Sequence, residues 1–299
     1  MIRIEASKYV NAMDKANPPV ETAKSGDIIQ FVTKDCFGGQ IQSEDQVMES
    51  LDWSEINPAT GPLYVQDAKA GDVLKVEILD IEIADKGVMI DGGGEGVMGK
   101  LICEATTKIL PIEDGKVIFN DKLAFPADPM IGVIGTAPKG EGIPTGTPGD
   151  HGSNMDCTKI RKGATVYLPV NVEGALLAMG DLHALMGDGE VGVCGVETDG
   201  IVTVKITVLK DCGLPTPFIV DEKHAISVYS AETADEACEG ATINMFKCLM
   251  SELHMTDHEA EMLLSVVGNV CICQIVDPER TARMEVPMSV FEAYGYQFA

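Results

Sequence analysis

Polar side chains able to transfer protons or bind a metal ion are concentrated between His151 and Glu197. Three pairs occur there at spacing i, i+2: Asn154 with Asp156, Asp181 with His183, and Asp188 with Glu190. Residues two apart in an extended chain project from the same face. The neighbouring runs are apolar, and acidic groups beside buried strands are costly unless they are paired or coordinate a metal. The pattern therefore predicts a shared site of carboxylates and imidazole.

Such a mixed, mostly hard set of ligands suits a divalent ion such as Zn²⁺, Ca²⁺, Mg²⁺ or Mn²⁺. An ion with an open coordination position lowers the pKa of a bound water to roughly 7 and polarises a carbonyl group. A carboxylate can then take a proton from the water and pass it to a leaving ammonia. This chemistry is sufficient to hydrolyse an unactivated amide.

Plainer interpretations of the same residues stay open. Asp181 and Asp188 each stand beside a glycine and could mark ordinary turns, and His183 could be a core histidine. The remaining histidines considered are expected to be structural or exposed: His224, His254 and His258. Cys157 and Cys194 flank the segment as possible nucleophiles. Spacing alone thus indicates a metal site without proving one.

Short β-branched runs between glycines and prolines predict the strands that position these side chains. Examples are residues 27–33, 73–79 and 202–208. The segments 23–35 and 68–80 repeat a glycine turn followed by a strand, and a weaker third copy begins at Arg161. Around the site, the connection Leu185-Met186-Gly187 predicts a hairpin that brings residues 181–183 and 188–190 together. The repeats favour duplicated sandwich or barrel units.

The C-terminal part has a different pattern. Residues 234–250 show helical spacing after Thr233, with Glu236 three residues later, and Thr256 with Glu259 begins a second helix in the same way. A strand is predicted at 270–276. We expect a mainly β fold in two parts: a sandwich or barrel core at 1–210 carrying the site, and an α+β region at 211–299 whose helices cover a sheet face.

Composition excludes several classes of function. The chain has 299 residues with 47 acidic and 22 basic side chains, a formal net charge of −25, which disfavours nucleic acid and anionic membranes as partners. No apolar run reaches the length of a membrane span, and the N-terminus lacks a signal core. The nine cysteines are irregularly spaced. We expect a cytoplasmic protein with buried, reduced cysteines.

Several of these motifs, in this order, resemble the acetamidase/formamidase family. The resemblance rests on GDHGSNMD at 149–156, VYLPV at 166–170 and MGDLHALMGDGEVGVCGVE at 179–197. It extends outward to residues 34–44, 57–65 and 129–135, and so covers most of the chain to about residue 210. Ser153 stands where many members have glycine, and a left-handed backbone there would cost about 1 kcal/mol.

The resemblance implies hydrolysis of short aliphatic linear amides, such as acetamide or formamide, to carboxylate and ammonia. It also implies a bound divalent metal, with Zn²⁺ or Ca²⁺ favoured, and a homodimer or higher homo-oligomer. The candidate catalytic residues are Glu190, as general base and acid, Asn154, for the oxyanion, and Asp188. The candidates for substrate binding are Gln40, Gln42, His151 and Glu197, and those for metal binding are Asp35, Asp156, Asp181 and His183.

Two alternatives remain beside this hypothesis. The chain could be a catalytically silent β protein that binds a metal or small molecule, or it could hydrolyse another C–N bond, such as that of a cyclic amide or diamide. Other amidase chemistries fit worse, since no G-x-S-x-G elbow is present. The loop Gly92–Gly96 lacks the Lys-Ser/Thr of a phosphate loop and is interpreted as a mobile segment near the site.

Overall fold

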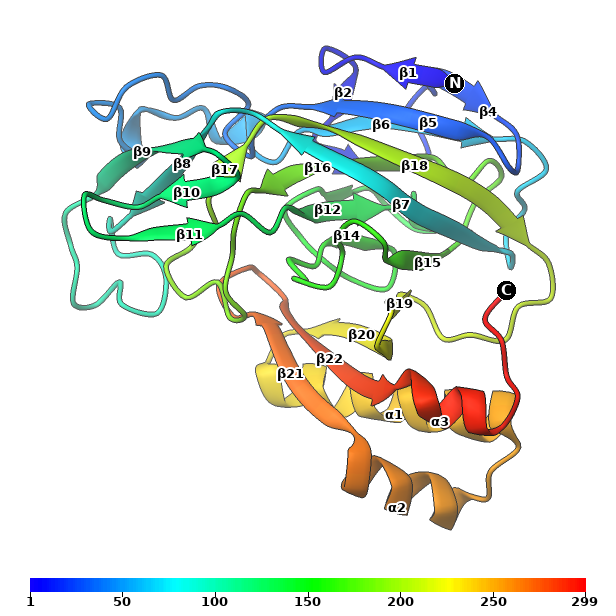
Figure 1. Cartoon of the computed structure of the whole chain (residues 1–299). Helices are drawn as coiled ribbons and strands as arrows, with labels where there is room; N and C mark the ends of the chain where they lie inside the picture. The colour runs from blue at the N-terminus through cyan, green and yellow to red at the C-terminus, as the bar shows by residue number, and fades with distance from the viewer.

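Two large β-sheets lie face to face in a computed structural model of residues 1–299, and helices gather at one end (Figure 1). The first sheet has nine strands. In spatial order these are β1 (Ile2–Ile4), β5 (Ile28–Thr33), β18 (Gly200–Leu209), β7 (Val73–Ile83), β15 (Thr165–Pro169), β19 (Phe218–Val220), β20 (His224–Ala231), β22 (Arg280–Pro287) and β21 (Asn269–Gln274).

The second sheet has eleven strands and carries most of the predicted site. Eight follow one path: β11 (Ala124–Pro126), β10 (Lys116–Ile118), β9 (Thr106–Glu113), β8 (Lys86–Asp91), β17 (Glu197–Thr198), β16 (Leu177–His183), β12 (Met130–Gly135) and β14 (Gly152–Asn154). β6 (Ala59–Val65) pairs with β16, β2 (Tyr9–Val10) and β4 (Glu21–Ala23). A separate two-stranded ribbon joins β3 (Ala12–Met13) and β13 (Ile143–Pro144).

The main hydrophobic core lies between the two sheets. Phe31 on β5 and Val202 on β18 face it from the first sheet, and Ile131 on β12 and Leu182 on β16 face it from the second. All four side chains are fully buried. Because alternate residues of a strand point to opposite faces, Asp181 and His183 on either side of Leu182 point away from this core.

The repeated glycine turns all lead into the first sheet. Gly26, Gly71 and Gly163 adopt φ values of 96°, 99° and 88°, which glycine tolerates without strain. The strands that follow are β5, β7 and β15, of which β7 and β15 are hydrogen-bonded neighbours and β5 and β7 flank β18. The three copies therefore contribute strands to the same sheet of the sandwich.

The C-terminal part extends the first sheet and covers one of its faces. β19 pairs with β15 across the predicted boundary at residue 210, so the sheet is continuous between the two parts. Helix α1 (Ala234–Leu253) packs on β20 and β22, α2 (Asp257–Val267) packs on α1, and α3 (Met288–Ala293) follows β22. A second core forms beneath them around Met245, Leu249 and Phe291. The mainly β fold with C-terminal helices is confirmed.

Both predicted helix starts are capping boxes. The Thr233 and Thr256 side chains accept hydrogen bonds from the backbone N–H of Glu236 and Glu259, whose carboxylates accept bonds from the cap residues in return. Two short 3₁₀ turns, η1 (Met48–Ser50) and η2 (Trp53–Glu55), lie in the loop between β5 and β6. None of the helices combines the length and the apolar character required to cross a bilayer.

We expect Thr256→Ala to lower the free energy of unfolding by about 1 kcal/mol, because it removes the cap of α2. Urea denaturation followed by circular dichroism measures the change. Thr256→Ser, which keeps the hydroxyl, is the matched control and is expected to stay close to the parent. Equal stability of the alanine and serine variants would contradict this role of the cap.

Candidate active site

A cavity of about 540 Å³ is lined in part by residues of the second sheet and has acidic side chains in its wall. Asp181 and His183 come from β16, and Asn154 comes from β14. Glu190 belongs to the loop between β16 and β17, and Glu197 begins β17. Four neighbouring segments of chain therefore bring their polar side chains to one place.

The imidazole of His183 is the centre of this cluster. Its Nε2 lies 3.1 Å from Glu197 Oε1, 3.4 Å from Asp181 Oδ1, 3.7 Å from Asp156 Oδ1 and 4.0 Å from Glu190 Oε1. Every one of these residues is buried. No lysine or arginine forms an ion pair with any of the four carboxylates, so the imidazole is their sole cationic partner among the residues.

Left-handed backbone conformations aim several of these side chains. Asp156, Asp181 and Glu190 have φ values of 41°, 57° and 47°, and Ser153 has 72°. Non-glycine residues are strained in this region and persist where the surrounding structure holds them, often at functional sites. Ser153 thus adopts the conformation that its glycine counterpart would favour, and its hydroxyl donates a 2.8 Å hydrogen bond to Thr145 O.

Gly132 on β12 makes the space that two of the acids share. A Cβ at this position would lie 2.4 Å from both Asp156 Oδ1 and Asp181 Oδ2. Val133 pairs with Gly180 and Ile131 with Leu182, so the glycine lies opposite Asp181. Only a residue without a side chain lets both carboxylates approach the strand here.

The cluster strongly perturbs the titration of its members. Burial, followed by the charge of Asp156, raises the pKa of Glu190 well above its usual value. Burial raises the pKa of Glu197 to about 8, although His183 acts in the opposite direction. Burial would lower the pKa of His183, but Glu197 and Asp181 outweigh it and raise that pKa well above normal. Without a cation, the carboxylates are therefore held together only at a high electrostatic cost.

Unpaired oxygen atoms show where a cation fits. Five buried carboxylate oxygens of the cluster have no hydrogen-bond partner: Asp156 Oδ1 and Oδ2, Asp181 Oδ1, Glu190 Oε2 and Glu197 Oε2. The potential ligand atoms form two groups, and within each group all atoms lie within 4.8 Å of one another. One group is formed by Asp156, His183 and Glu190, and the other by Cys36, Asp181 and Glu197. Buried polar atoms are normally satisfied, so this set has the chemistry of a divalent metal site.

Asn154 lines the cavity, but five of the predicted site residues lie outside both the cluster and the cavity lining. Gln40 and Gln42 bond to the backbone of their own loop, and neither lines the cavity. Asp35 accepts a 2.8 Å bond from Gly39 N, and burial raises its pKa to about 6. His151 is buried away from the cavity lining, and burial lowers its pKa to about 4. Asp188 forms an ion pair with Arg283 at 2.6 Å.

The predicted hairpin forms with a different second strand, β17 in place of residues 188–190. β16 pairs with β17, and His183 stands opposite Glu197, whereas residues 188–190 belong to the loop between these strands. The i, i+2 rule places Asp181 and His183 in the cluster because they flank the core residue Leu182 on a strand. It fails for Asp188 and Glu190 because Gly189, at φ = 104°, breaks the extended chain.

Two residues of the site were missed from the sequence. Asp277 lies in the loop after β21, lines the cavity and accepts a 3.0 Å hydrogen bond from Asn154 Nδ2. Cys36 lines the cavity beside Asp181 and Glu197. The sequence Asp277-Pro278 indicates only a turn, and Cys36 is a single cysteine next to the predicted ligand Asp35. No local sequence pattern therefore marks either residue as part of the site. The site thus includes a residue from beyond the predicted 1–210 core.

Neither cysteine proposed as a nucleophile is well placed: the thiol of Cys194 is poorly activated, and Cys157 lies outside the cavity lining. Cys194 lines the cavity, but burial raises its pKa well above normal, and its sulfur bonds with the backbone of Ile90. Cys157 is fully buried, and although burial acts to raise its pKa, Cys273 and Arg283 lower it. A thiol in its protonated form is a weak nucleophile, so the geometry favours the carboxylates as the reactive groups.

The fold and the acidic cavity define a β-sandwich hydrolase, and comparisons with known proteins identify its family. The model of the Acetamidase/Formamidase family matches residues 3–141 and 139–293. The chain therefore belongs to the acetamidase/formamidase family, and the expected class of enzyme, an amidohydrolase of linear amides, is confirmed.

Solved structures and curated relatives agree with this assignment. An acetamidase from Bacillus halodurans superposes with a TM-score of 0.97 at 48% identity, covering 98% of this chain and 100% of that one. A recombinant predicted acetamidase/formamidase from Thermoanaerobacter tengcongensis gives the same TM-score and identity, with 99% of each chain covered. A formamidase from Methylophilus methylotrophus is 27% identical over 92% of this chain and 87% of its own length.

We expect Gly132→Ala to lower amide turnover at least about tenfold, because misplacing reacting groups by an ångström costs on this scale or more. The added methyl group would push Asp156 and Asp181 apart. Ammonia release measures turnover, and circular dichroism verifies the fold. Gly140→Ala, at an exposed position where a Cβ meets nothing within 4 Å, is the control. Full activity of the Gly132 variant would contradict the proposed crowding.

Proposed function

We propose that the chain hydrolyses short aliphatic linear amides to a carboxylate and ammonia in this cavity, with a divalent metal ion bound by the acidic cluster. The observation that carries the proposal is the set of buried, unpaired carboxylate oxygens around His183, beside a cavity that Asp181, Glu190 and Glu197 line. The names of the relatives, acetamidase and formamidase, support an amide substrate.

The cluster has suitable ligands for the ion. Asp156 and His183 offer a carboxylate and an imidazole beside Glu190, and Asp181, Glu197 and Cys36 offer a second set with a thiol. Asp35, an expected ligand, belongs to neither group. Imidazole, carboxylate and thiolate are the usual ligands of Zn²⁺, whereas Ca²⁺ takes oxygen ligands only. Involvement of Cys36 would therefore favour zinc.

A bound divalent ion supplies a water molecule of lowered pKa and polarises a carbonyl oxygen. Glu190 is placed to move the protons: its Oε2 is buried and unpaired, and its residue lines the cavity. In the proposed reaction, Glu190 accepts a proton as the water oxygen attacks the amide carbon. It then donates this proton to the nitrogen as the C–N bond breaks, so that a carboxylic acid and ammonia leave.

Asn154 is placed to orient the amide. One hydrogen of its Nδ2 is engaged by Asp277, and its Oδ1 is buried and unpaired. The free oxygen can accept a hydrogen bond from the substrate NH₂, and the second Nδ2 hydrogen remains for the carbonyl oxygen. The predicted oxyanion role thus becomes a shared role in binding both ends of the amide.

Part of the cavity lining is apolar and can receive the acyl group. Phe37, Met48, Ile56 and Val193 line it together with Trp53, the sole tryptophan, which is 58% exposed. The volume is about 540 Å³, and a water molecule's share of liquid volume is about 30 Å³. The cavity therefore has room for acyl groups longer than that of acetamide.

The assembly and compartment of the protein also remain proposals. The likeness to the family supports a homo-oligomer, which analytical ultracentrifugation would measure. All nine cysteines are free, and five of them are buried, which supports a reducing compartment such as the cytoplasm.

We expect Glu190→Gln to lower kcat for acetamide by a factor on the order of 10² or more, because the amide cannot transfer the proton. Ammonia release at saturating substrate measures kcat, and Glu190 is compared with Glu95, an acid in the glycine-rich loop, as a Glu95→Gln control. Near-normal turnover by the Glu190 variant would exclude this residue as the base.

The alternative function is tested on the parent protein with a panel of linear, cyclic and diamide substrates. A parent protein that binds metal but hydrolyses none of these amides would favour a silent binding protein.

We expect removal of the metal to abolish turnover and to lower Tm. At ligand concentrations near 100 times Kd, binding stabilises the folded state by about 2.7 kcal/mol. Metal analysis by mass spectrometry gives the stoichiometry, and the fluorescence of Trp53 in the cavity wall gives a readout independent of activity. A metal-free protein with unchanged Tm and full turnover would contradict a metal-assisted reaction.

A further inference from the structure

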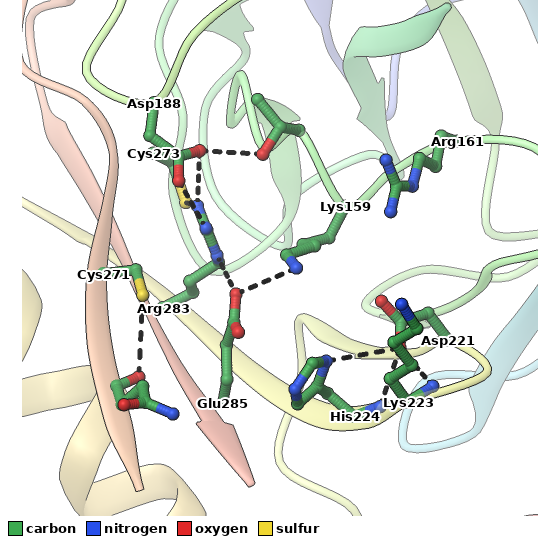
Figure 2. Close-up of polar contacts among 12 residues, drawn as sticks. Lys159, Arg161, Asp188, Asp221, Lys223, His224, Cys271, Cys273, Arg283 and Glu285 are labelled. Carbon is green, nitrogen blue, oxygen red and sulfur yellow. Dashed lines mark hydrogen bonds and ion pairs between the residues drawn. The ribbon is translucent and has the colours of Figure 1, made fainter. Parts of the chain in front are cut away.

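Asp188, two residues before Glu190 in the sequence, is held by a buried arginine. Arg283 on β22 is 2% exposed and donates from Nη1 to Asp188 Oδ1 at 2.9 Å and from Nη2 to Oδ2 at 2.6 Å (Figure 2). Two parallel bonds between a guanidinium and a carboxylate fix orientation as well as distance. The loop that carries Glu190 is therefore tied to the C-terminal part of the sheet.

The charges around this clamp are balanced. Arg283 Nε also donates to Glu285 Oε1 at 2.7 Å, and Lys159 Nζ lies 3.3 Å from the same carboxylate oxygen (Figure 2). Two acids thus face two bases. A buried charge that is paired and hydrogen-bonded holds its geometry, whereas removing one partner leaves an uncompensated charge.

Two backbone hydrogen bonds at Gly189, the residue after Asp188, and one side-chain bond from Thr158 add to the connection. Gly189 N donates to Cys273 O at 2.8 Å, and Ile275 N donates to Gly189 O at 3.2 Å, so this short segment runs beside the end of β21. Thr158, two residues after Asp156, donates to Asp188 Oδ1 at 2.7 Å. Asp188 is therefore joined to the segments that carry two other acids of the site.

The same end of β21 also holds Asp277. The fully buried Gln274 accepts hydrogen bonds at Oε1 from Val276 N at 3.0 Å and Asp277 N at 3.1 Å, and donates to Glu279 O at 2.6 Å. The positions of Glu190 and Asp277 are thereby set by one structural element.

We propose, on the basis of the proposed function, that Asp188 and Arg283 are positioning residues for amide hydrolysis. They hold Glu190 in the cluster. Without them, repulsion by Asp156 and the more favourable hydration of an exposed carboxylate would move Glu190 toward solvent. Glu190 lies outside any strand and has a left-handed backbone, so the regular sheet does not hold it there. Small displacements of a catalytic group cost large factors in rate, and the clamp prevents them.

The test compares two variants of Asp188 with a surface control. Asp188→Asn removes the charge, and Asp188→Glu keeps the charge but lengthens the side chain. We expect both to lower kcat for acetamide at least about tenfold with KM changed less, because the base is displaced while the substrate contacts remain. Asp128→Asn, which breaks the exposed pair with Arg161, is expected to stay within about twofold of the parent.

A merely structural ion pair would give a different pattern. Asp188→Glu would then keep full turnover at temperatures where it is folded, and that result would overturn the proposal. Arg283→Lys keeps the positive charge but loses the bidentate contact with Asp188. We expect it to lower kcat as Asp188→Glu does. If Asp188→Asn is unfolded at the assay temperature, the Asp188→Glu and Arg283→Lys variants decide.

Hydrogen exchange separates failure of the clamp from failure of the proposed function. We expect the backbone amides of Gly189, Glu190 and Val193 to exchange at least about tenfold faster in Asp188→Asn than in the parent or in Asp128→Asn, since local opening exposes them. Unchanged exchange would overturn the proposal. If the parent hydrolyses no amide, the proposed function fails, and this measurement still tests the clamp.

Discussion

Repulsion among buried carboxylates around one imidazole is the constraint on which the rest of this structure depends. Asp156, Asp181, Glu190 and Glu197 approach His183 Nε2 within 4.0 Å, and all are buried. Burial and like charge raise the pKa of Asp156 and Glu190 well above their usual values. The divalent ion that we propose for this cluster would relieve both costs at once and would supply a water of lowered pKa for amide hydrolysis.

The fold supplies the rigidity that this constraint demands. β16 holds Asp181 and His183 between its neighbours β12 and β17, and the absence of a side chain at Gly132 makes room for two carboxylates. The C-terminal part contributes Asp277 and, through Arg283, restrains the loop that carries Glu190. Helix α1 of that part packs on β20, β22 and β21, and β22 and the loop after β21 carry Arg283 and Asp277.

Local patterns predicted much of this from the sequence. Both capping boxes and the core strands follow from residue spacing, and the strand period places Asp181 and His183 together because Leu182 must face the core. Contacts between distant segments were out of reach. Asp188 looked catalytic by its spacing, yet its partner lies on β22, and Asp277 comes close to Asn154 only through the sheet topology. Spacing also gave no sign that Gly189 would turn the chain.

The cluster's affinity for a cation is tested most directly by anomalous diffraction from crystals of the purified protein, recorded on both sides of the zinc absorption edge. The proposed site predicts an anomalous peak enclosed by ligand atoms of Asp156, His183 and Glu190, or of Cys36, Asp181 and Glu197. Crystals soaked in zinc that show no peak, with the carboxylates protonated and bonded to one another, would contradict a metal-assisted amide hydrolase.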